Sequence, residues 1–228
     1  MLYEGQCNDG GQHALHGLVY NVEFAVETQS TSAVTLRYDL GDDAIYPFSV
    51  RINVAYALTA RGLTCTIGAT NRSDERVPIA LGAHPYFPYD AATTLVTTAQ
   101  HYSEVGPGLI PTGHVKPVDV LGVIAGGETG LGELVLDNCF SGMSRDASGR
   151  AETALHYQDG SVTVVWQDDC LEYLQMFTKP DFPWAAGARG AIGIEPQTAP
   201  PNAFNSGEGL HWLSPGEDFS VQWGIEAR

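Results

Sequence analysis

Residues 48–69, FSVRINVAYALTARGLTCTIGA, carry the pattern that decides the fold class. From residue 48 to residue 58, apolar side chains occupy every second position, and mainly smaller or polar residues lie between them. Successive side chains of a β-strand point to opposite faces, so this alternation predicts a long strand with one apolar face. The alternation resumes over residues 63–69, after a turn at Arg61-Gly62, and the two segments together predict a β-hairpin.

The same alternation recurs along the chain in short segments separated by Gly and Pro. We predict further strands at residues 22–28, 33–38, 93–99, 133–136, 152–157, 161–167, 172–177, 191–196 and 219–225. No segment sustains the 3.6-residue apolar period of an amphipathic helix. The sequence therefore predicts an all-β fold of antiparallel sheets, with about a dozen strands in a large sandwich. Because no linker or change in composition divides it, we expect residues 1–228 to form a single domain.

The charge of the chain limits the class of ligand. Asp and Glu number 27 against 11 Lys and Arg, which gives a formal net charge of −16. A nucleic-acid partner is excluded, because the sequence has no basic stripe to neutralise phosphates. The overall negative field also disfavours an anionic substrate. A neutral, polar small molecule fits this charge best.

The cysteines and the chain start bear on metal binding and location. Cys7, Cys65, Cys139 and Cys170 show no Cys-x-x-Cys spacing and no Cys/His cluster, so we expect no metal site. The first nine residues are mixed and polar, and no apolar run approaches the length of a membrane span. We therefore expect a cytoplasmic protein with reduced thiols and no membrane partner.

The stretch richest in chemistry is Leu81-Gly82-Ala83-His84-Pro85-Tyr86-Phe87, which follows Asn71-Arg72-Ser73. Proline fixes its own φ and restricts the residue before it, so His84 is expected in a rigid turn with aromatic neighbours. A histidine held in this way can give or take one proton near neutral pH. The alternative is a histidine that only satisfies a carbonyl of the turn, and the local sequence leaves both interpretations open.

A second stretch, Ala191-Ile192-Gly193-Ile194-Glu195-Pro196-Gln197, places a carboxylate at the end of an apolar strand. Carboxylates are rarely buried without a partner, and a buried one tends to have a raised pKa and to act as a base. The alternative is a carboxylate that caps loop amides. Two further candidates, His16 beside Gly17 and Asp137 at a strand end, are each more typical of structural residues when taken singly.

Taken together and in order, these segments resemble the aldose 1-epimerase (galactose mutarotase-like) family. The matching motifs are His16-Gly17, Asn71-Arg72 through Phe87, Leu136 to Phe140, and Ile194 to Phe204. The most specific are the Gly-Ala-His-Pro-Tyr-Phe run and the Glu-Pro run with the loop that follows it. The resemblance covers almost the whole chain.

The resemblance implies a β-supersandwich with a monosaccharide bound in an open cleft, and no cofactor. It implies that Glu195 is the general base and His84 the general acid of ring opening. Among substrate-binding candidates, His16 and Asp137 resemble residues that hydrogen-bond the sugar. Asn71 and Arg72, from the Asn-Arg motif, are further substrate-binding candidates, and Gln175 is a weaker match to a strand that lines the cleft. Tyr86, Phe87 and Trp184 are aromatic residues that could stack on a sugar, with core packing as the alternative.

The chain departs from the family pattern near its start, because members usually carry several strands upstream of the His-Gly motif. We therefore expect an N-terminally truncated domain with an exposed sheet edge. Three alternatives stay open: a hexose-6-phosphate 1-epimerase, a non-catalytic sugar-binding relative, and a lectin-like accessory domain. The sequence leaves the preferred sugar and the oligomeric state undetermined.

Overall fold

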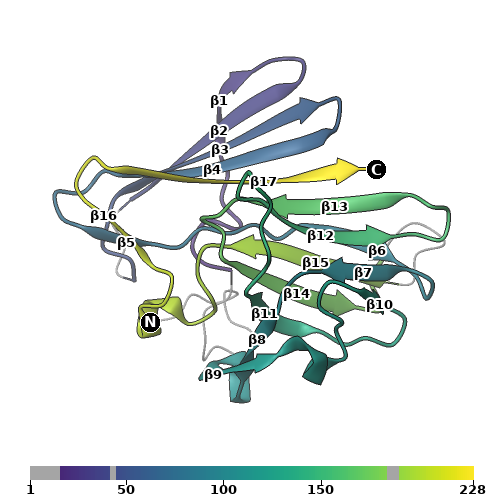
Figure 1. The fold of residues 1–228 in the computed structure, drawn as a ribbon. Helices are drawn as coiled ribbons and strands as arrows, with labels where there is room; N and C mark the ends of the chain where they lie inside the picture. The colour runs from purple at the N-terminus through teal and green to yellow at the C-terminus, as the bar shows by residue number, and fades with distance from the viewer. Residues whose placement is uncertain (1–15, 42–44, 184–189) are drawn as a thin grey trace.

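The computed structural model describes residues 16–41, 45–183 and 190–228. All the strand pairs are antiparallel and form three sheets, as Figure 1 shows. The nine-stranded sheet runs in the order β1 (Ala25–Gln29), β2 (Ala33–Leu40), β3 (Val50–Thr59), β4 (Gly62–Asn71), β17 (Asp218–Ala227), β13 (Val162–Gln167), β12 (Ala151–His156), β7 (Thr94–Thr97) and β10 (Glu128–Gly130).

The second sheet has six strands, which lie below β13 and β17 in Figure 1. Its order is β6 (Tyr86–Tyr89), β15 (Gly190–Gln197), β14 (Tyr173–Lys179), β11 (Asp137–Ser141), β8 (His101–Val105) and β9 (Pro111–Pro117). A two-stranded sheet pairs β16 (His211–Leu213) with β5 (Val77–Ile79). The described helices are α1 (Ala203–Ser206) and the 3₁₀ turns η1 (Pro107–Leu109) and η2 (Val118–Leu121). Neither α1 nor these turns combine the length and apolar character that a bilayer-crossing helix requires.

The hairpin predicted from residues 48–69 is confirmed. β3 and β4 pair along their whole length, from Val50 opposite Asn71 to Thr59 opposite Gly62. Gly62 has a φ of 150°, and a Cβ at this position would collide with the backbone of β17. The glycine of the predicted turn is therefore required by the close approach of a third strand.

The main hydrophobic core lies between the two large sheets. Each contributes alternate residues to it, such as Ile67 and Trp223 from the nine-stranded sheet and Leu174 and Ile192 from the six-stranded sheet. A second cluster packs β3 and β4 against the two-stranded sheet. The all-β, sandwich-like prediction is therefore confirmed, and alternate positions of the six-stranded sheet remain for a second, polar face.

One predicted strand, residues 133–136, is wrong. Its apolar alternation is real, because Leu136 is buried and Val135 is 78% exposed. However, the backbone N–H of Leu136 donates to the side chain of Thr178 on β14 rather than to a backbone carbonyl oxygen of that strand. The strand begins only at Asp137, so this residue opens β11 instead of ending a strand. The strands missed by the sequence are short or contain proline, which weakens the alternating signal, and they are β5, β6, β8, β9, β10, β11 and β16.

Candidate functional site

The polar face of the six-stranded sheet brings most of the predicted site residues together. The register of β14 and β15 places Gln175 opposite Glu195, and the register of β11 and β14 places Asp137 opposite Phe177. Residues opposite one another, and residues two apart on one strand, share a face. Gln175, Glu195 and Asp137 therefore all point away from the main core, whose side of β15 is formed by residues such as Ile194.

His84 is held beside β15 by the backbone on each side of it. Ala83 donates its N–H to the carbonyl oxygen of Pro196 at 3.1 Å, and Ile194 donates to Pro85 at 3.2 Å. As a result, His84 Nε2 lies 3.3 Å from Glu195 Oε1. The atoms are close enough for an ion pair but not aligned as a hydrogen bond, because Oε1 has no hydrogen-bond partner among the described residues.

Burial dominates the protonation of this pair. Glu195 is 4% exposed, and its pKa is raised to about 8, first by burial and then by the negative charge of Asp137. The pKa of His84 is lowered from 6.5, first by burial and then by the charge of His16. Burial disfavours both the Glu195 carboxylate and the His84 imidazolium, so the pair as a unit retains one proton at neutral pH.

Gln175 and Asp137 form a second polar pair beside Glu195. Gln175 Nε2 donates to Asp137 Oδ1 at 2.8 Å, which partly offsets the rise in the pKa of Asp137 that burial causes. Gln175 Oε1 and His84 Nδ1 are buried and, like Glu195 Oε1, have no partner in the described part of the chain. Buried polar atoms are nearly always hydrogen-bonded, so three unpaired atoms on one face indicate a place for a polar ligand.

His16 completes the cluster from the segment before β1. Its ring lies edge-on to His84, with 5.1 Å between centroids, and burial of the ring lowers its pKa although the residue as a whole is exposed. His16 has a φ of 62°, an unusual value for a residue other than glycine. Such backbone strain is concentrated at functional sites, where the surrounding structure maintains it.

An aromatic group borders the cluster. The ring of Tyr86 lies 4.6 Å from that of His84, 6.5 Å from that of Phe177 and 5.2 Å from that of Phe182. Of the aromatic candidates named from the sequence, Phe87 instead belongs to the core and Trp184 lies outside the described residues. Phe177 and Phe182 were not singled out from the sequence. The alternation of β14, which places Phe177 on the same face as Gln175, is the signal that identifies Phe177.

Comparisons with known proteins identify the family of the chain. The model of the aldose 1-epimerase family matches residues 2–225. The chain belongs to the aldose 1-epimerase family. It is 26% identical to the uncharacterized protein YihR of Escherichia coli K12 over 221 residues, which are 93% of this chain and 67% of that protein.

Crystal structures show that this epimerase-family chain has the mutarotase-like fold. A galactose mutarotase-like protein from Clostridium acetobutylicum superposes with a TM-score of 0.79 at 18% identity, over 94% of this chain and 69% of that one. The GalM/aldose epimerase homologue from C. elegans gives a TM-score of 0.76 at 18% identity, over 90% and 68% of the two chains. At this identity the likeness establishes the fold alone.

Asn71 and Arg72 lie apart from the acid–base cluster of this family member. The Asn71 amide donates to the carbonyl oxygens of Glu75 and Leu213, and its oxygen accepts from the Ser73 N–H at 2.8 Å. Because these bonds occupy a side chain that is only 1% exposed, the prediction of a substrate contact for Asn71 is not supported. Arg72 is exposed and contributes, after Arg51 and Arg37, to lowering the pKa of Asp39.

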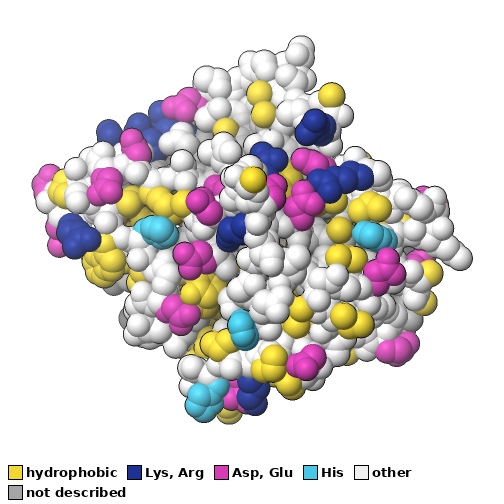
Figure 2. All heavy atoms as spheres, in the orientation of Figure 1, with side chains coloured by type: hydrophobic (Ala, Val, Ile, Leu, Met, Phe, Trp, Pro, Cys, Tyr) yellow, Lys and Arg dark blue, Asp and Glu magenta, His cyan; other side chains and the backbone are white. Residues whose placement is uncertain are grey.

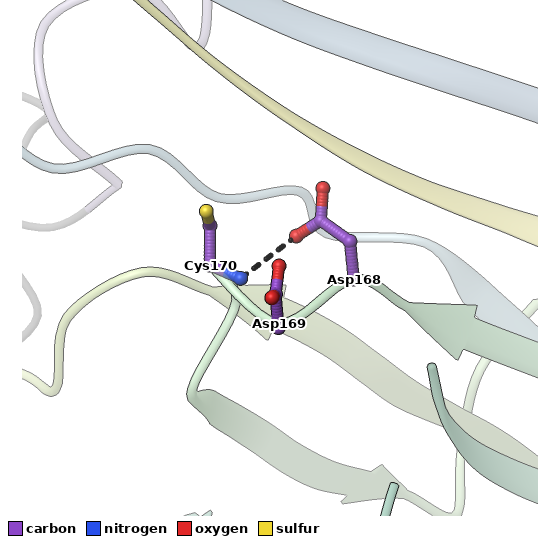
Figure 3. A group of neighbouring side chains, drawn as sticks. All are labelled: Asp168, Asp169 and Cys170. Atoms are coloured by element: carbon purple, nitrogen blue, oxygen red, sulfur yellow. Dashed lines mark hydrogen bonds between the residues drawn. The ribbon is translucent and has the colours of Figure 1, made fainter. Parts of the chain in front are cut away.

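A separate group of potential metal ligands, Asp168, Asp169 and Cys170, lies in the turn between β13 and β14 (Figure 3). Asp168 Oδ1 accepts the backbone N–H of Cys170 at 3.2 Å and that of Leu171 at 3.3 Å, and Oδ2 accepts the N–H of Gln222. The Asp168 carboxylate therefore accepts three backbone hydrogen bonds, which gives it a structural role in the turn.

Two hollows of the described surface lie away from the acid–base cluster. One of about 400 Å³ is lined by residues that include Arg61, Arg150 and Trp166, and one of about 760 Å³ by residues that include Tyr157 and Asp159. Both are open depressions without unpaired buried polar atoms of the kind found around Glu195. We therefore locate the site by its chemistry rather than by the depth of the surface.

The described Lys and Arg side chains do not act on the acid–base cluster. On the face shown in Figure 2, most Lys and Arg side chains lie in the upper half of the view. The pKa shifts of Glu195, His84 and Asp137 arise from burial, from hydrogen bonds and from one another or His16, with no contribution from a described Arg or Lys. The described site therefore favours a ligand without an anionic group.

Proposed function

We propose that this chain is an aldose 1-epimerase that interconverts the α and β anomers of a neutral monosaccharide. The observation that carries the proposal is the contact of 3.3 Å between His84 Nε2 and Glu195 Oε1 on a polar face that holds several unpaired buried atoms. Anomerisation requires one group that accepts a proton and one that donates a proton, within reach of the same carbon. The pair supplies both from a single shared proton.

In the proposed reaction, the Glu195 carboxylate takes the proton of the C1 hydroxyl while the His84 imidazolium gives a proton to the ring oxygen. The C1–O bond of the ring breaks and the open-chain aldehyde forms. Rotation about the C1–C2 bond presents the other face of the aldehyde, and the same two proton transfers run in reverse to close the ring. Atoms and electrons balance without any redox change, so the reaction needs no cofactor.

The neighbouring groups have roles that follow from their positions. Burial keeps charge on Glu195 and His84 unfavourable until the sugar hydroxyls replace the missing hydrogen bonds. Gln175 and Asp137 offer an amide oxygen and a carboxylate beside Glu195 for those hydroxyls. His16 opposes a second positive charge on His84. No described Lys or Arg contributes to the pKa shifts of Glu195, His84 and Asp137, and this favours neutral sugars over sugar phosphates, which usually require a cationic partner.

Polarimetry tests the proposal. Freshly dissolved α-D-glucose or α-D-galactose should reach its equilibrium rotation faster with the protein than without it. Glu195→Gln keeps the size of the side chain but removes the base, so it should slow the reaction about 10²- to 10⁴-fold. Glu128→Gln, the same exchange at a side chain that is 66% exposed on β10, should leave the rate unchanged.

Two results would redirect the assignment. Failure of a folded sample to accelerate either sugar, combined with binding of the sugar, would favour a non-catalytic sugar-binding relative. Acceleration confined to glucose 6-phosphate would favour a hexose-6-phosphate 1-epimerase. A Glu195→Gln variant with the wild-type rate would show that another group is the base.

A further inference from the structure

Gly193 lies at the centre of β15, two residues before Glu195 and on the same face of the sheet. It is not among the residues with positive φ, so its backbone does not require glycine. What glycine provides here is space. A Cβ added at this position would lie 2.5 Å from Glu195 Oε1, far closer than real Cβ atoms approach an oxygen, and 3.4 Å from Glu195 Cδ.

The same space also borders the histidine, because the added Cβ would lie 3.4 Å from His84 Cε1. Gly193 is paired with Phe177 on one side and with Tyr86 on the other. The centroids of these two rings are only 6.5 Å apart, so the rings lean toward each other across the glycine. We call the space that is bounded by Gly193, Phe177 and Tyr86 the Gly193 niche.

We propose that Gly193 is a positioning residue of the acid–base pair, because the Gly193 niche holds the Glu195 carboxyl group folded back along β15 against His84. The side chain of Glu195 has several rotatable bonds, and a free carboxylate would turn toward water. Glu195 is instead 4% exposed, and its Oε1 atom occupies the space that a Cβ on Gly193 would need. The function of the glycine is thus to admit a neighbouring side chain rather than to bend the backbone.

The niche also affects the pH at which the pair of Glu195 and His84 loses its proton. The titratable groups that face Glu195 come from three segments, and they are His16, His84, Tyr86, Asp137 and Cys139. Burial is the largest cause of the raised pKa of Glu195. Expelling the carboxyl from the niche would return it toward water and lower that pKa, so the pair would lose its last proton at a lower pH.

The variant Gly193→Ala tests the inference, which rests on the proposed function for its rate measurement. Mutarotation should slow by up to about a hundred-fold, mainly in kcat, because the carboxyl is displaced rather than removed. The alkaline limb of the pH profile should move to lower pH. Gly68→Ala is the matched control, since a Cβ on Gly68 in β4 would meet its nearest atoms at an ordinary 3.8 Å. The control should leave the rate and its pH profile unchanged.

A stability cycle tests the niche without reference to catalysis. Gly193→Ala should lower the Tm of the wild-type protein, but the same change should cost little when Glu195 is already alanine, because the colliding carboxyl is absent. If Gly193→Ala alone does not fold, the double variant should restore folding. The inference is overturned if Gly193→Ala has the wild-type rate and pH profile, or if its effect on Tm is the same in both backgrounds. A wild-type protein without epimerase activity would refute the proposed function, and the Tm cycle would still decide the role of Gly193.

Discussion

Asn71 and Glu195 are almost equally buried, yet the structure treats them in opposite ways. Asn71, at the end of β4, is 1% exposed, and two donors and one acceptor of its amide are bonded to backbone groups. Glu195, inside β15, is 4% exposed, and its Oε1 atom has no hydrogen-bond partner in the described part of the chain. Burial alone therefore does not mark a candidate site residue. The feature that sets Glu195 apart is a buried unpaired atom that lies beside other unpaired polar atoms, those of His84 and Gln175.

The polar residues of the Asn-Arg motif and those around the Glu-Pro motif also differ in what they contact. The polar atoms at the end of β4 connect a loop to β16 and so hold the two-stranded sheet in place. Those on β14 and β15 are directed at the solvent side of a sheet whose other face is core. The first arrangement stabilises the fold, whereas the second is costly to the fold and favours a ligand.

The largest effect on folding is expected at Asn71. Asn71→Ala would remove three hydrogen bonds and leave buried carbonyl oxygens and an N–H unpaired, so the free energy of unfolding should fall by about 3 kcal/mol. The kcat of the folded fraction should not change. Urea unfolding and polarimetry of the same sample would measure both quantities. A loss of kcat with unchanged stability would make Asn71 a site residue and remove the contrast with Glu195.

Replacing Glu195 is expected to raise stability, whereas replacing Asn71 is expected to lower it. Burial raises the pKa of Glu195 to about 8 in the folded protein, from the ordinary 4.5 of an exposed glutamate. Glu195 therefore destabilises the fold progressively as the pH rises from 4.5 to about 8, by an amount on the order of a few kcal/mol. Glu195→Gln cannot ionise, so its Tm should exceed that of the wild type by an amount that grows across this interval.

Thermal unfolding of both proteins between pH 5 and pH 8.5 would measure this difference, with Glu128→Gln as the control at an exposed carboxylate. The control should follow the wild type at every pH. A Tm difference that is constant with pH would show that Glu195 ionises as freely in the folded chain as in the unfolded one. The raised pKa would then have no basis.

Much of this contrast could be predicted from the sequence. The alternation of residues 48–69 predicted the β3–β4 hairpin, a local signal that depends on the order of neighbouring residues. The Glu-Pro and His-Pro-Tyr-Phe runs drew attention to Glu195 and His84, but only the family resemblance implied their roles as base and acid. The same resemblance placed Asn71 with the site, because the Asn-Arg motif is part of the family pattern.

What the sequence missed depends on contacts between distant segments. The bonds from Asn71 to Leu213 join residues 142 positions apart, and no local pattern reports them. The niche at Gly193 depends on the register of β15 with β14 and β6, which determines that Phe177 and Tyr86 flank the glycine. Short strands such as β6 escaped prediction because three or four residues, with a proline among them, carry too little alternation.

The smallest effect on KM and on the free energy of unfolding is expected at Arg72. Arg72 follows Asn71 directly, but its side chain is exposed and its charge acts on Asp39 of β2. Arg72→Gln should therefore leave the KM for sugar unchanged and alter the free energy of unfolding by less than about 0.5 kcal/mol. Gln175→Ala, at a side chain bonded to Asp137 beside Glu195, should raise KM in the same assay. A similar rise in KM for Arg72→Gln would place this arginine in the sugar site. Arg72 would then belong with the site residues on β15 and not with the structural residues at the end of β4.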